Sequence, residues 1–170
     1  MAEEIFAAVD ECDQVVAFRT RSEIHRLQLR HRAAHVLVFN ARGEVLLQKR
    51  LRSKECAPGL WDSSAAGHVD RDESYDACAG RELGEELGLR PAPPLERLFK
   101  IDACAETGWE FVWVYRCAAE GPFAFCREEM DAIGWFRPEA LDRDLAAEAD
   151  RYSGSLHLVW RRLRAASATS

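Results

Sequence analysis

Three glutamates in one short segment have the clearest capacity for chemistry in this sequence. Glu82, Glu85 and Glu86 stand at positions i, i+3 and i+4, so on a helix their carboxylates fall within an arc of about 100°. Like charges at that spacing repel each other and cost roughly a few tenths of a kcal/mol per pair in water. A divalent cation reverses that cost, and ligands made only of oxygen suit Mg²⁺ or Mn²⁺ better than zinc.

Neighbouring residues are suited to position this acidic cluster. Arg81 follows Glu73 by eight residues, and a pairing between the two would tie the preceding loop to the helix. Gly67 stands where a strand has to end. A glycine there adopts a backbone conformation closed to other residues, or leaves its carbonyl open as a metal ligand. We therefore predict a metal site with Gly67 beside the glutamates.

Four cations within six residues lie upstream of the cluster in an otherwise acidic chain. They are Lys49, Arg50, Arg52 and Lys54, just before a Pro58-Gly59 turn. Taken alone, such a run is typical of a solvated loop, but its place next to the acidic segment favours phosphate contact. Arg50 is the strongest candidate because a guanidinium forks onto phosphate oxygens.

The elements that position these groups follow from periodicity and turn residues. Ser74 is suited to be the N-cap of a helix, apolar residues then recur every four positions, and Gly88 stands where a glycine would end the helix. These features predict a helix over Ser74–Leu87. Trp109, Phe111, Trp113 and Tyr115 alternate with other residues and are more typical of a core strand than of a base-stacking site. The predicted strands are Ile5–Val9, Gln14–Arg19, Ala33–Phe39, Glu44–Gln48, Trp61–Val69, Leu95–Ala103, Trp109–Cys117 and Ala132–Phe136.

The remaining segments complete an α/β or α+β fold in which a mixed β-sheet is sandwiched between α-helices. Ser22–Arg32 is predicted as helix or loop, and Pro138 opens a helix at its first position. A last helix carries the apolar stripe of Leu156, Val159, Trp160 and Leu163, and Ala165–Ser170 is expected to be a frayed tail.

Composition limits the classes of protein to which the chain can belong. Its 170 residues, 48% of them apolar, suit one domain spanning 1–170 with a buried core. The net charge of −6 argues against nucleic acid or an anionic membrane as partner, and no apolar run is long enough to span a membrane. The six cysteines are scattered without a CxxC pair, which predicts reduced, buried thiols in a cytoplasmic protein. No partner protein is evident.

The acidic segment and its neighbours form a longer pattern of fixed residues. Gly67, Glu73, Arg81-Glu82, Glu85-Glu86 and Gly88, with the aliphatic residues between them, match position for position the signature of the Nudix hydrolases. At average residue usage, a chance match of these fixed residues occurs about once in 10⁸ positions. The flanks around His31–His35, Leu46–Arg50 and Pro58–Asp62 are similar to the branch of this family nearest to isopentenyl diphosphate isomerases.

The resemblance implies the Nudix fold and a Mg²⁺-dependent pyrophosphohydrolase, with Mn²⁺ as a possible substitute. Its expected substrate is a nucleoside 5′-di- or triphosphate or a nucleoside diphosphate conjugate, cleaved by attack of water on phosphorus. The metal ligands are then Glu82, Glu85, Glu86 and Gly67. Catalytic roles fall on Glu85, Glu86, Arg81 and Glu73. The general base stays open between Glu85 and Glu86 on the helix and Glu128 and Glu129 in a later loop.

Two alternatives remain. Isopentenyl diphosphate isomerases bind a second, histidine-rich metal site, and His31 and His68 align with two of its ligands. These enzymes also need a cysteine just before the pair matching Gly67-His68, and here that stretch is Ser63-Ser64-Ala65-Ala66. A non-catalytic module that senses a nucleotide is the other alternative, although such modules are expected to have lost glutamates of the signature.

Overall fold

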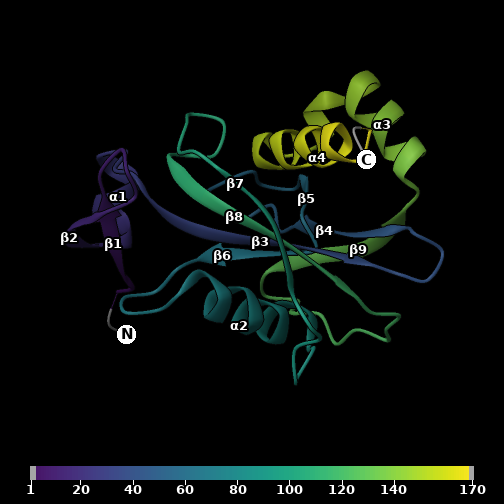
Figure 1. The fold of residues 1–170 in the computed structure, drawn as a ribbon, viewed down its shortest axis with the longest axis horizontal. Helices are drawn as coiled ribbons and strands as arrows, with labels where there is room; N and C mark the ends of the chain where they lie inside the picture. Colours follow the sequence, from purple (N-terminus) through teal and green to yellow (C-terminus); the bar gives the residue numbers. More distant parts are fainter. Residues whose placement is uncertain (1–2, 169–170) are drawn as a thin grey trace.

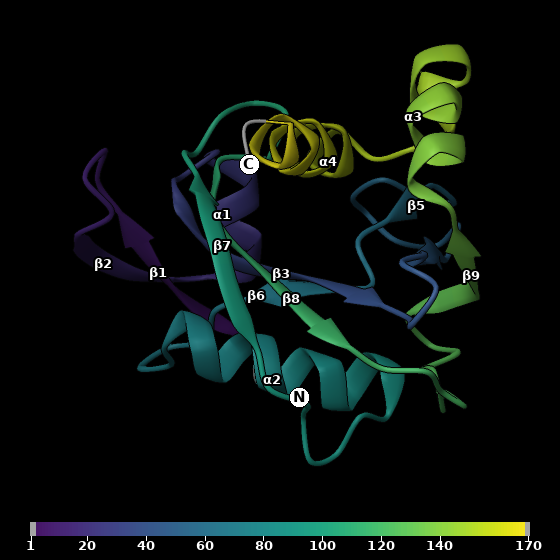
Figure 2. The same cartoon turned by 45° about the vertical axis from the view of Figure 1, so that its right-hand side comes forward.

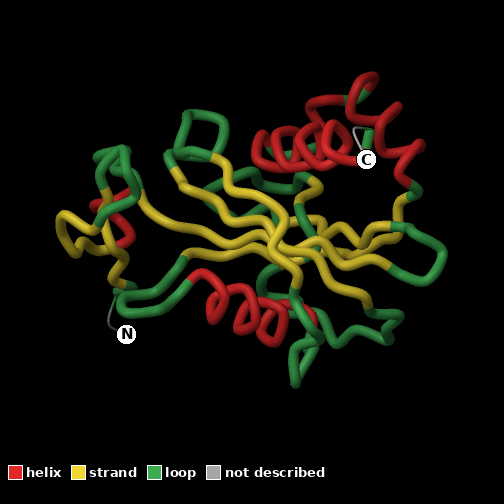
Figure 3. Tube along the Cα trace, viewed as in Figure 1, coloured by secondary structure: helices red, strands yellow, loops and turns green. Residues whose placement is uncertain are grey.

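A mixed sheet of seven strands lies between helices in the computed structural model, which describes residues 3–168 (Figure 1). Five strands follow the order β5-β4-β3-β8-β7, while β6 pairs with β3 and β9 pairs with β4. Helix α2 covers one face of the sheet, and α3 and α4 cover the other (Figures 1 and 2). The tube view in Figure 3 shows β1 and β2 apart from this sheet, as a separate hairpin. The predicted sandwich of helices around a mixed sheet is confirmed.

The predicted helix of the acidic segment and each predicted strand have a counterpart in the structure. Ser74 caps α2 by accepting from the N–H of Ala77, and Gly88 ends it in the left-handed conformation at φ 72°. No helix among residues 3–168 has the length and apolar composition that crossing a membrane requires. The elements are β1 Ile5–Val9, β2 Val15–Thr20, α1 Arg21–Arg26, β3 His31–Phe39, β4 Val45–Arg50, β5 Trp61–Asp62, β6 Ala65–His68, α2 Tyr75–Leu87, β7 Glu96–Ile101, β8 Glu110–Ala118, β9 Met130–Phe136, α3 Pro138–Ala147, a 3-10 turn Ala149–Arg151, and α4 Gly154–Ser167.

The sheet buries both of its faces because helices lie on each side. In the central strand β3, Ala34, Val36 and Val38 belong to the core under α2, whereas Ala33 and Leu37 belong to the core under α4. This alternation is the period of two that a strand imposes on its side chains. Of the aromatic stripe, Phe111 and Tyr115 are buried in β8 as predicted, whereas Trp113 is half-buried and Trp109 precedes the strand in the left-handed conformation at φ 66°.

The single strand predicted over Trp61–Val69 is wrong, because the chain there forms two short strands. β5 pairs with β4 and β6 pairs with β3, so the segment changes partner between them. Ser64 lies at this change: its hydroxyl accepts from the N–H of Val38 at 2.7 Å and donates to the carbonyl of Leu46. The side chain of Ser64 therefore links β3 to β4 in place of direct backbone hydrogen bonds between these two strands.

The segment predicted as helix or loop, Ser22–Arg32, is helical only at its start. α1 ends at Arg26 and is held by a capping box in which Thr20 and Glu23 satisfy each other's backbone N–H groups. β3 already begins at His31, two residues before the predicted start. The reason is its parallel register with β8, which begins with His31 opposite Glu110.

Two further expectations are wrong. Ala165–Ser167 do not fray but continue α4, where Ser167 donates its hydroxyl to the carbonyl of Leu163 at 3.1 Å. The last two residues of the predicted tail, 169 and 170, lie outside the described residues. All six cysteines are unpaired, but only Cys78 and Cys117 are buried; Cys12 and Cys56 are exposed because they lie in connections between strands.

Candidate active site

Helix α2 buries two of its three glutamates and leaves the third at the surface. Glu82 and Glu86 lie against the sheet and are buried, with 8% and 5% of their surface exposed. The side chain of Glu85 is 49% exposed. The spacing i, i+3, i+4 therefore brings all three to one side of the helix, but only two of them enter the protein.

The end of β6 lies directly over the two buried carboxylates. A Cβ atom at Gly67 would stand 1.9 Å from Oε1 of Glu82, so no side chain fits there. The N–H of Ala66 donates to Oε2 of Glu86 at 3.0 Å, and Nε2 of Gln48 donates to the same oxygen at 2.9 Å. Strand backbone and carboxylate share this space, which is why the position requires glycine.

Arg81 joins the loop before α2 to the glutamates. Its Nε and Nη2 donate to the two oxygens of Glu73 at 2.8 and 2.9 Å, which is the pairing that the sequence predicted. Its Nη1 donates to Oε1 of Glu82 at 2.6 Å and to Oε2 of Glu85 at 3.1 Å. In this structure the cation between Glu82 and Glu85 is therefore the guanidinium of Arg81.

Glu82, Glu85 and Glu86 do not form a ready-made group of metal ligands in this structure. Among residues 3–168, the group whose ligand atoms lie close enough to hold a metal ion consists of three histidines, with those atoms within 4.8 Å of one another. Between Oε1 of Glu82 and Oε2 of Glu85 lies Nη1 of Arg81, which donates to both.

Burial dominates the electrostatics of the two inner glutamates. It raises the pKa of Glu82 to about 7, although the charge and hydrogen bond of Arg81 act in the opposite direction. The pKa of Glu86 rises to about 8, first through burial and then through the negative charge of Glu82. Two neighbouring carboxylates that are costly to ionise form a site that a divalent cation would stabilise. Their oxygen-only donor set fits such an ion.

Strand β4 places two of the four predicted phosphate-binding residues on opposite faces of the sheet. Arg50 follows Gln48 by two residues and so shares its face, where the charge of Arg50 lowers the pKa of Glu86. Lys49 points to the other face, and its ammonium group lies 5.9 Å from the ring centroid of Trp61. Only Arg50 of this pair lies beside the glutamates.

The other two predicted phosphate-binding residues lie in the loop after β4. Lys54 forms an ion pair with Glu129 through its Nζ. The side chain of Arg52 packs on Gly59, 3.2 Å from where a Cβ of that residue would stand. Arg52 is therefore exposed, whereas Lys54 links the loop after β4 to the loop before β9.

The two alternative bases lie in the loop before β9. Glu128 is exposed, and Glu129 is half-buried in its ion pair with Lys54. The loop itself rests on the end of α2, where the N–H of Cys126 donates to the carbonyl of Glu86 at 2.8 Å. Within the described residues, neither side chain forms a hydrogen bond with the glutamates of α2.

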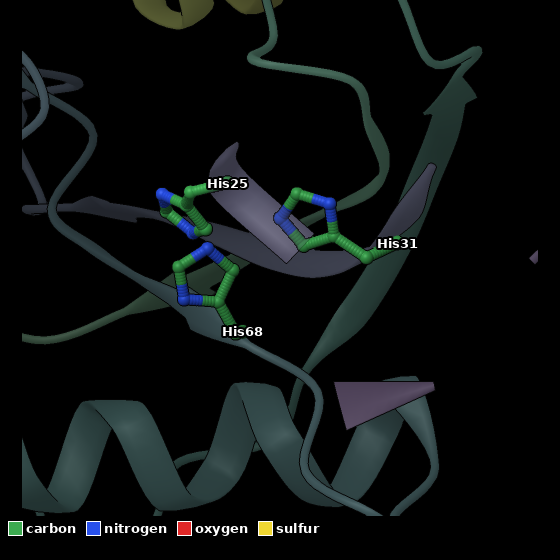
Figure 4. A group of neighbouring side chains, drawn as sticks. All are labelled: His25, His31 and His68. Carbon is green, nitrogen blue, oxygen red and sulfur yellow. The ribbon is translucent and has the colours of Figure 1, made fainter. Parts of the chain in front are cut away.

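A second group of chemically capable side chains lies next to Gly67. His25 of α1, His31 of β3 and His68 of β6 point toward one another (Figure 4). One ring nitrogen of each lies within 4.8 Å of the others. Nε2 of His25 and Nε2 of His31 are buried and have no hydrogen-bond partner among residues 3–168. Buried imidazole nitrogens without partners are rare in proteins and are suited to binding a metal ion.

Glu110 of β8 adds a carboxylate to the three histidines. Its Oε1 lies 3.0 Å from Nε2 of His68 and 3.6 Å from Nε2 of His31. Burial raises the pKa of the Glu110 carboxyl, but the two imidazoles lower it by more, so the net pKa is well below its ordinary value. The pKa of His25 is lowered by burial and by the charges of His68 and His31. Three imidazoles and one carboxylate form a donor set typical of zinc and other transition metals.

Only two of the four residues of this second group were identified from the sequence. His31 and His68 entered through the family resemblance, whereas His25 and Glu110 were missed. No local pattern marks these two residues, because they come from distant segments. Glu110 reaches the group through the pairing of β8 with β3, and His25 through the packing of α1 on β1. The thiol of Cys56, also unpredicted here, lies 4.0 Å from Nδ1 of His25.

Known proteins share both the sequence pattern and this architecture. The NUDIX domain model matches residues 29–156. A Nudix hydrolase of Yersinia pestis is 35% identical over 150 residues, covering 85% of this chain and 77% of that protein. A prenyl-diphosphate phosphatase of Methanosarcina mazei is 33% identical over 156 residues, covering 89% and 90%. A crystal structure of a protein from Deinococcus radiodurans superposes with a TM-score of 0.84 at 26% identity, covering 94% and 98%.

The chain therefore belongs to the Nudix family and has the Nudix fold. It is an enzyme, a Nudix hydrolase. Membership of this family supports a pyrophosphohydrolase activity without specifying the substrate. Nudix proteins generally use divalent cations.

We expect Gly67→Ala to damage the site, because its Cβ would overlap the carboxylate of Glu82. The carboxylate has to swing away, which should cost about 1–3 kcal/mol of stability and most of the hydrolytic activity. Thermal unfolding and turnover measure the two effects. The matched control is Gly80→Ala within α2, where the added Cβ meets nothing closer than 3.9 Å; it should keep activity. Equal behaviour of both variants would contradict the prediction.

We also expect the stability of the metal-free protein to fall between pH 5.5 and 8.5 through Glu86. Its folded pKa of about 8 lies above the ordinary value of 4.5 for a glutamate, so the folded state binds more protons in this window and loses stability as pH rises. Glu86→Gln removes this loss, and its stability relative to wild type should increase by about 3 kcal/mol across the window. Urea unfolding in EDTA at both pH values measures it, with Glu128→Gln as an exposed control. A pH-independent difference would refute this role of Glu86.

Proposed function

We propose that this enzyme uses Mg²⁺ to cleave the diphosphate linkage of a small molecule by attack of water on phosphorus. The observation that carries the proposal is the burial of Glu82 and Glu86 against the backbone at Gly67. Two adjacent carboxylates in that position destabilise the fold when ionised. A hard cation compensates for this cost, and the oxygen donors match Mg²⁺, with Mn²⁺ as a substitute.

In this proposal Glu82, Glu85 and Glu86 hold the ion together with the carbonyl of Gly67. When bound, Mg²⁺ supplies neutralisation of the diphosphate charge and a lower pKa for the attacking water. A bound ion would compete with Nη1 of Arg81 for Glu82 and Glu85. Nε and Nη2 of Arg81 bond Glu73 instead, so they would hold the loop to the helix with or without the ion.

The proton of the attacking water goes to a carboxylate of this site. Glu85 is exposed and bonded only to Arg81, whereas Oε2 of Glu86 already accepts two hydrogen bonds. Both remain candidates for the general base. Glu128 and Glu129 are the alternatives, because their loop rests on the end of α2.

We propose a nucleoside 5′-di- or triphosphate or a nucleoside diphosphate conjugate as the substrate. Arg50 is our first candidate for phosphate contact, supported by the effect of its charge on Glu86, and Lys49, Arg52 and Lys54 are the further candidates. A prenyl diphosphate is a second candidate, favoured by the similarity to the prenyl-diphosphate phosphatase of Methanosarcina mazei. Both candidates present the same diphosphate to the glutamates and differ in the group attached to it.

We further propose that the chain acts as one domain in the cytoplasm, without nucleic acid, membrane or protein partner. The N-terminal hairpin packs on the rest of the protein, since Phe6 stacks on His68 with ring centroids 4.7 Å apart. The six free thiols support a reducing compartment.

We expect the purified protein with Mg²⁺ to release phosphate, pyrophosphate or a nucleoside monophosphate from a member of a substrate panel. The panel contains nucleoside di- and triphosphates, nucleoside diphosphate conjugates and prenyl diphosphates. Glu85→Gln and Glu86→Gln should lower turnover by a factor of about 10²–10⁴, the range of a general base, with their folds intact by circular dichroism. Binding of a nucleotide without any product would instead indicate a sensing module. If a variant keeps more than about a tenth of the wild-type turnover, the residue that it replaces is not the general base.

Isopentenyl diphosphate isomerase is the second candidate function, and the histidine cluster is the observation that favours it. The stretch Ser63–Ala66 has no thiol for the isomerase proton transfer, but Cys56 of the loop after β4 reaches the cluster at His25. We propose that His25, His31, His68 and Glu110 bind a transition metal ion in either case. Isomerised product without phosphate release would support the isomerase.

We expect Co²⁺ to bind at the histidine cluster and to give a visible absorption band typical of nitrogen ligation. His25→Gln and His68→Gln should each lower the affinity of this site by about 10-fold or more, because each removes a ligand. His157→Gln, in α4, is the control and should bind as the wild type does. Titration followed by absorbance measures all four proteins. An unchanged spectrum and affinity in both cluster variants would show that the ion binds elsewhere.

A further inference from the structure

The side chain of Gln48 is buried in an apolar strand next to the glutamates of α2. Only 1% of its surface is exposed, and β4 pairs on both sides at this residue, with Asp62 of β5 and Ile133 of β9. An amide in such a place is costly to bury unless its polar atoms have partners. A leucine or methionine of similar volume would pack there without that cost.

One end of this amide has a partner that explains it. Nε2 donates to Oε2 of Glu86 at 2.9 Å, and the N–H of Ala66 donates to the same oxygen at 3.0 Å. Two donors from different strands thus fix one oxygen of the carboxylate. No donor among the described residues contacts Oε1 of Glu86, so this second oxygen is the one available to a cation.

The other end of the amide has no partner. Oε1 of Gln48 is buried and accepts no hydrogen bond in the part of the chain that the structure describes. A buried acceptor without a donor destabilises the folded state, and such atoms are uncommon in proteins. A water molecule on the ion beside Glu86 is a donor that would satisfy it.

We propose that Gln48 is a positioning residue for the hydrolytic site. Its Nε2 orients Glu86 so that Oε1 of that carboxylate faces the ion, and its own Oε1 accepts a hydrogen bond from a water bound to the ion. The inference rests on the proposed function, since it assigns Glu86 to the metal. Residues that orient metal ligands in this way typically affect metal affinity or activity by about 10- to 100-fold.

The test uses Gln48→Met, which keeps the volume but removes both hydrogen-bonding ends, with Mn²⁺ as the probe for binding. We expect the dissociation constant of Mn²⁺ to rise and kcat to fall, each about 10-fold or more, with little change in KM. The melting temperature should not fall below that of the control Leu46→Met. This control changes a buried residue of the same strand and face, two positions earlier, and should keep the metal affinity of the wild type.

A double mutant separates positioning from a structural role. If Gln48 acts through Glu86, then adding Gln48→Met to Glu86→Gln should weaken Mn²⁺ binding much less than it does in the wild type. Equal effects in both backgrounds, or a lower melting temperature with unchanged Mn²⁺ affinity and kcat, would overturn the inference. If Glu86→Gln itself leaves Mn²⁺ affinity and turnover unchanged, the proposed function fails together with the inference. If only Gln48→Met behaves as the wild type, the inference fails alone.

Discussion

The constraint on which this structure depends is the burial of two carboxylates against the backbone at Gly67. Glu82 and Glu86 occupy space that a Cβ at Gly67 would fill, and backbone and amide donors of β6 and β4 fix one of them. Burial makes both expensive to ionise. A protein keeps such a pair only if something compensates for it, and the proposed metal ion does so while providing the chemistry.

Arg81 is the protein's own compensation for this charge. It bonds Glu73 with one edge of its guanidinium and bridges Glu82 and Glu85 with the other. A guanidinium is well suited to this because its donors lie in a fixed fork. The loop that follows β6 and the glutamates of α2 are therefore held in register by one side chain.

The two candidate metal sites share the end of β6. The backbone of Gly67 contacts Glu82, and the next residue contributes its imidazole to the histidine cluster. The carbonyl of His68 also accepts from Nη2 of Arg81 at 3.0 Å. The two groups are therefore adjacent along β6, and Arg81 contacts both the backbone at His68 and the glutamates of α2.

The sequence by itself determined the family, the acidic helix with its caps, the pairing of Arg81 with Glu73 and most of the strands. These depend on short-range rules: helical spacing of charges, turn residues, and alternation of apolar side chains. Tertiary structure decided the rest. Successive side chains of β4 point to opposite faces of the sheet, so the placement of β4 between β5 and β9 decides that Arg50, and not Lys49, faces the glutamates. The same placement decides the partners of Gln48. Glu110 joins the histidine cluster because β8 pairs with β3 from His31 opposite Glu110, and His25 joins it because α1 packs on the β1–β2 hairpin. Such contacts between distant segments leave no local trace in the chain.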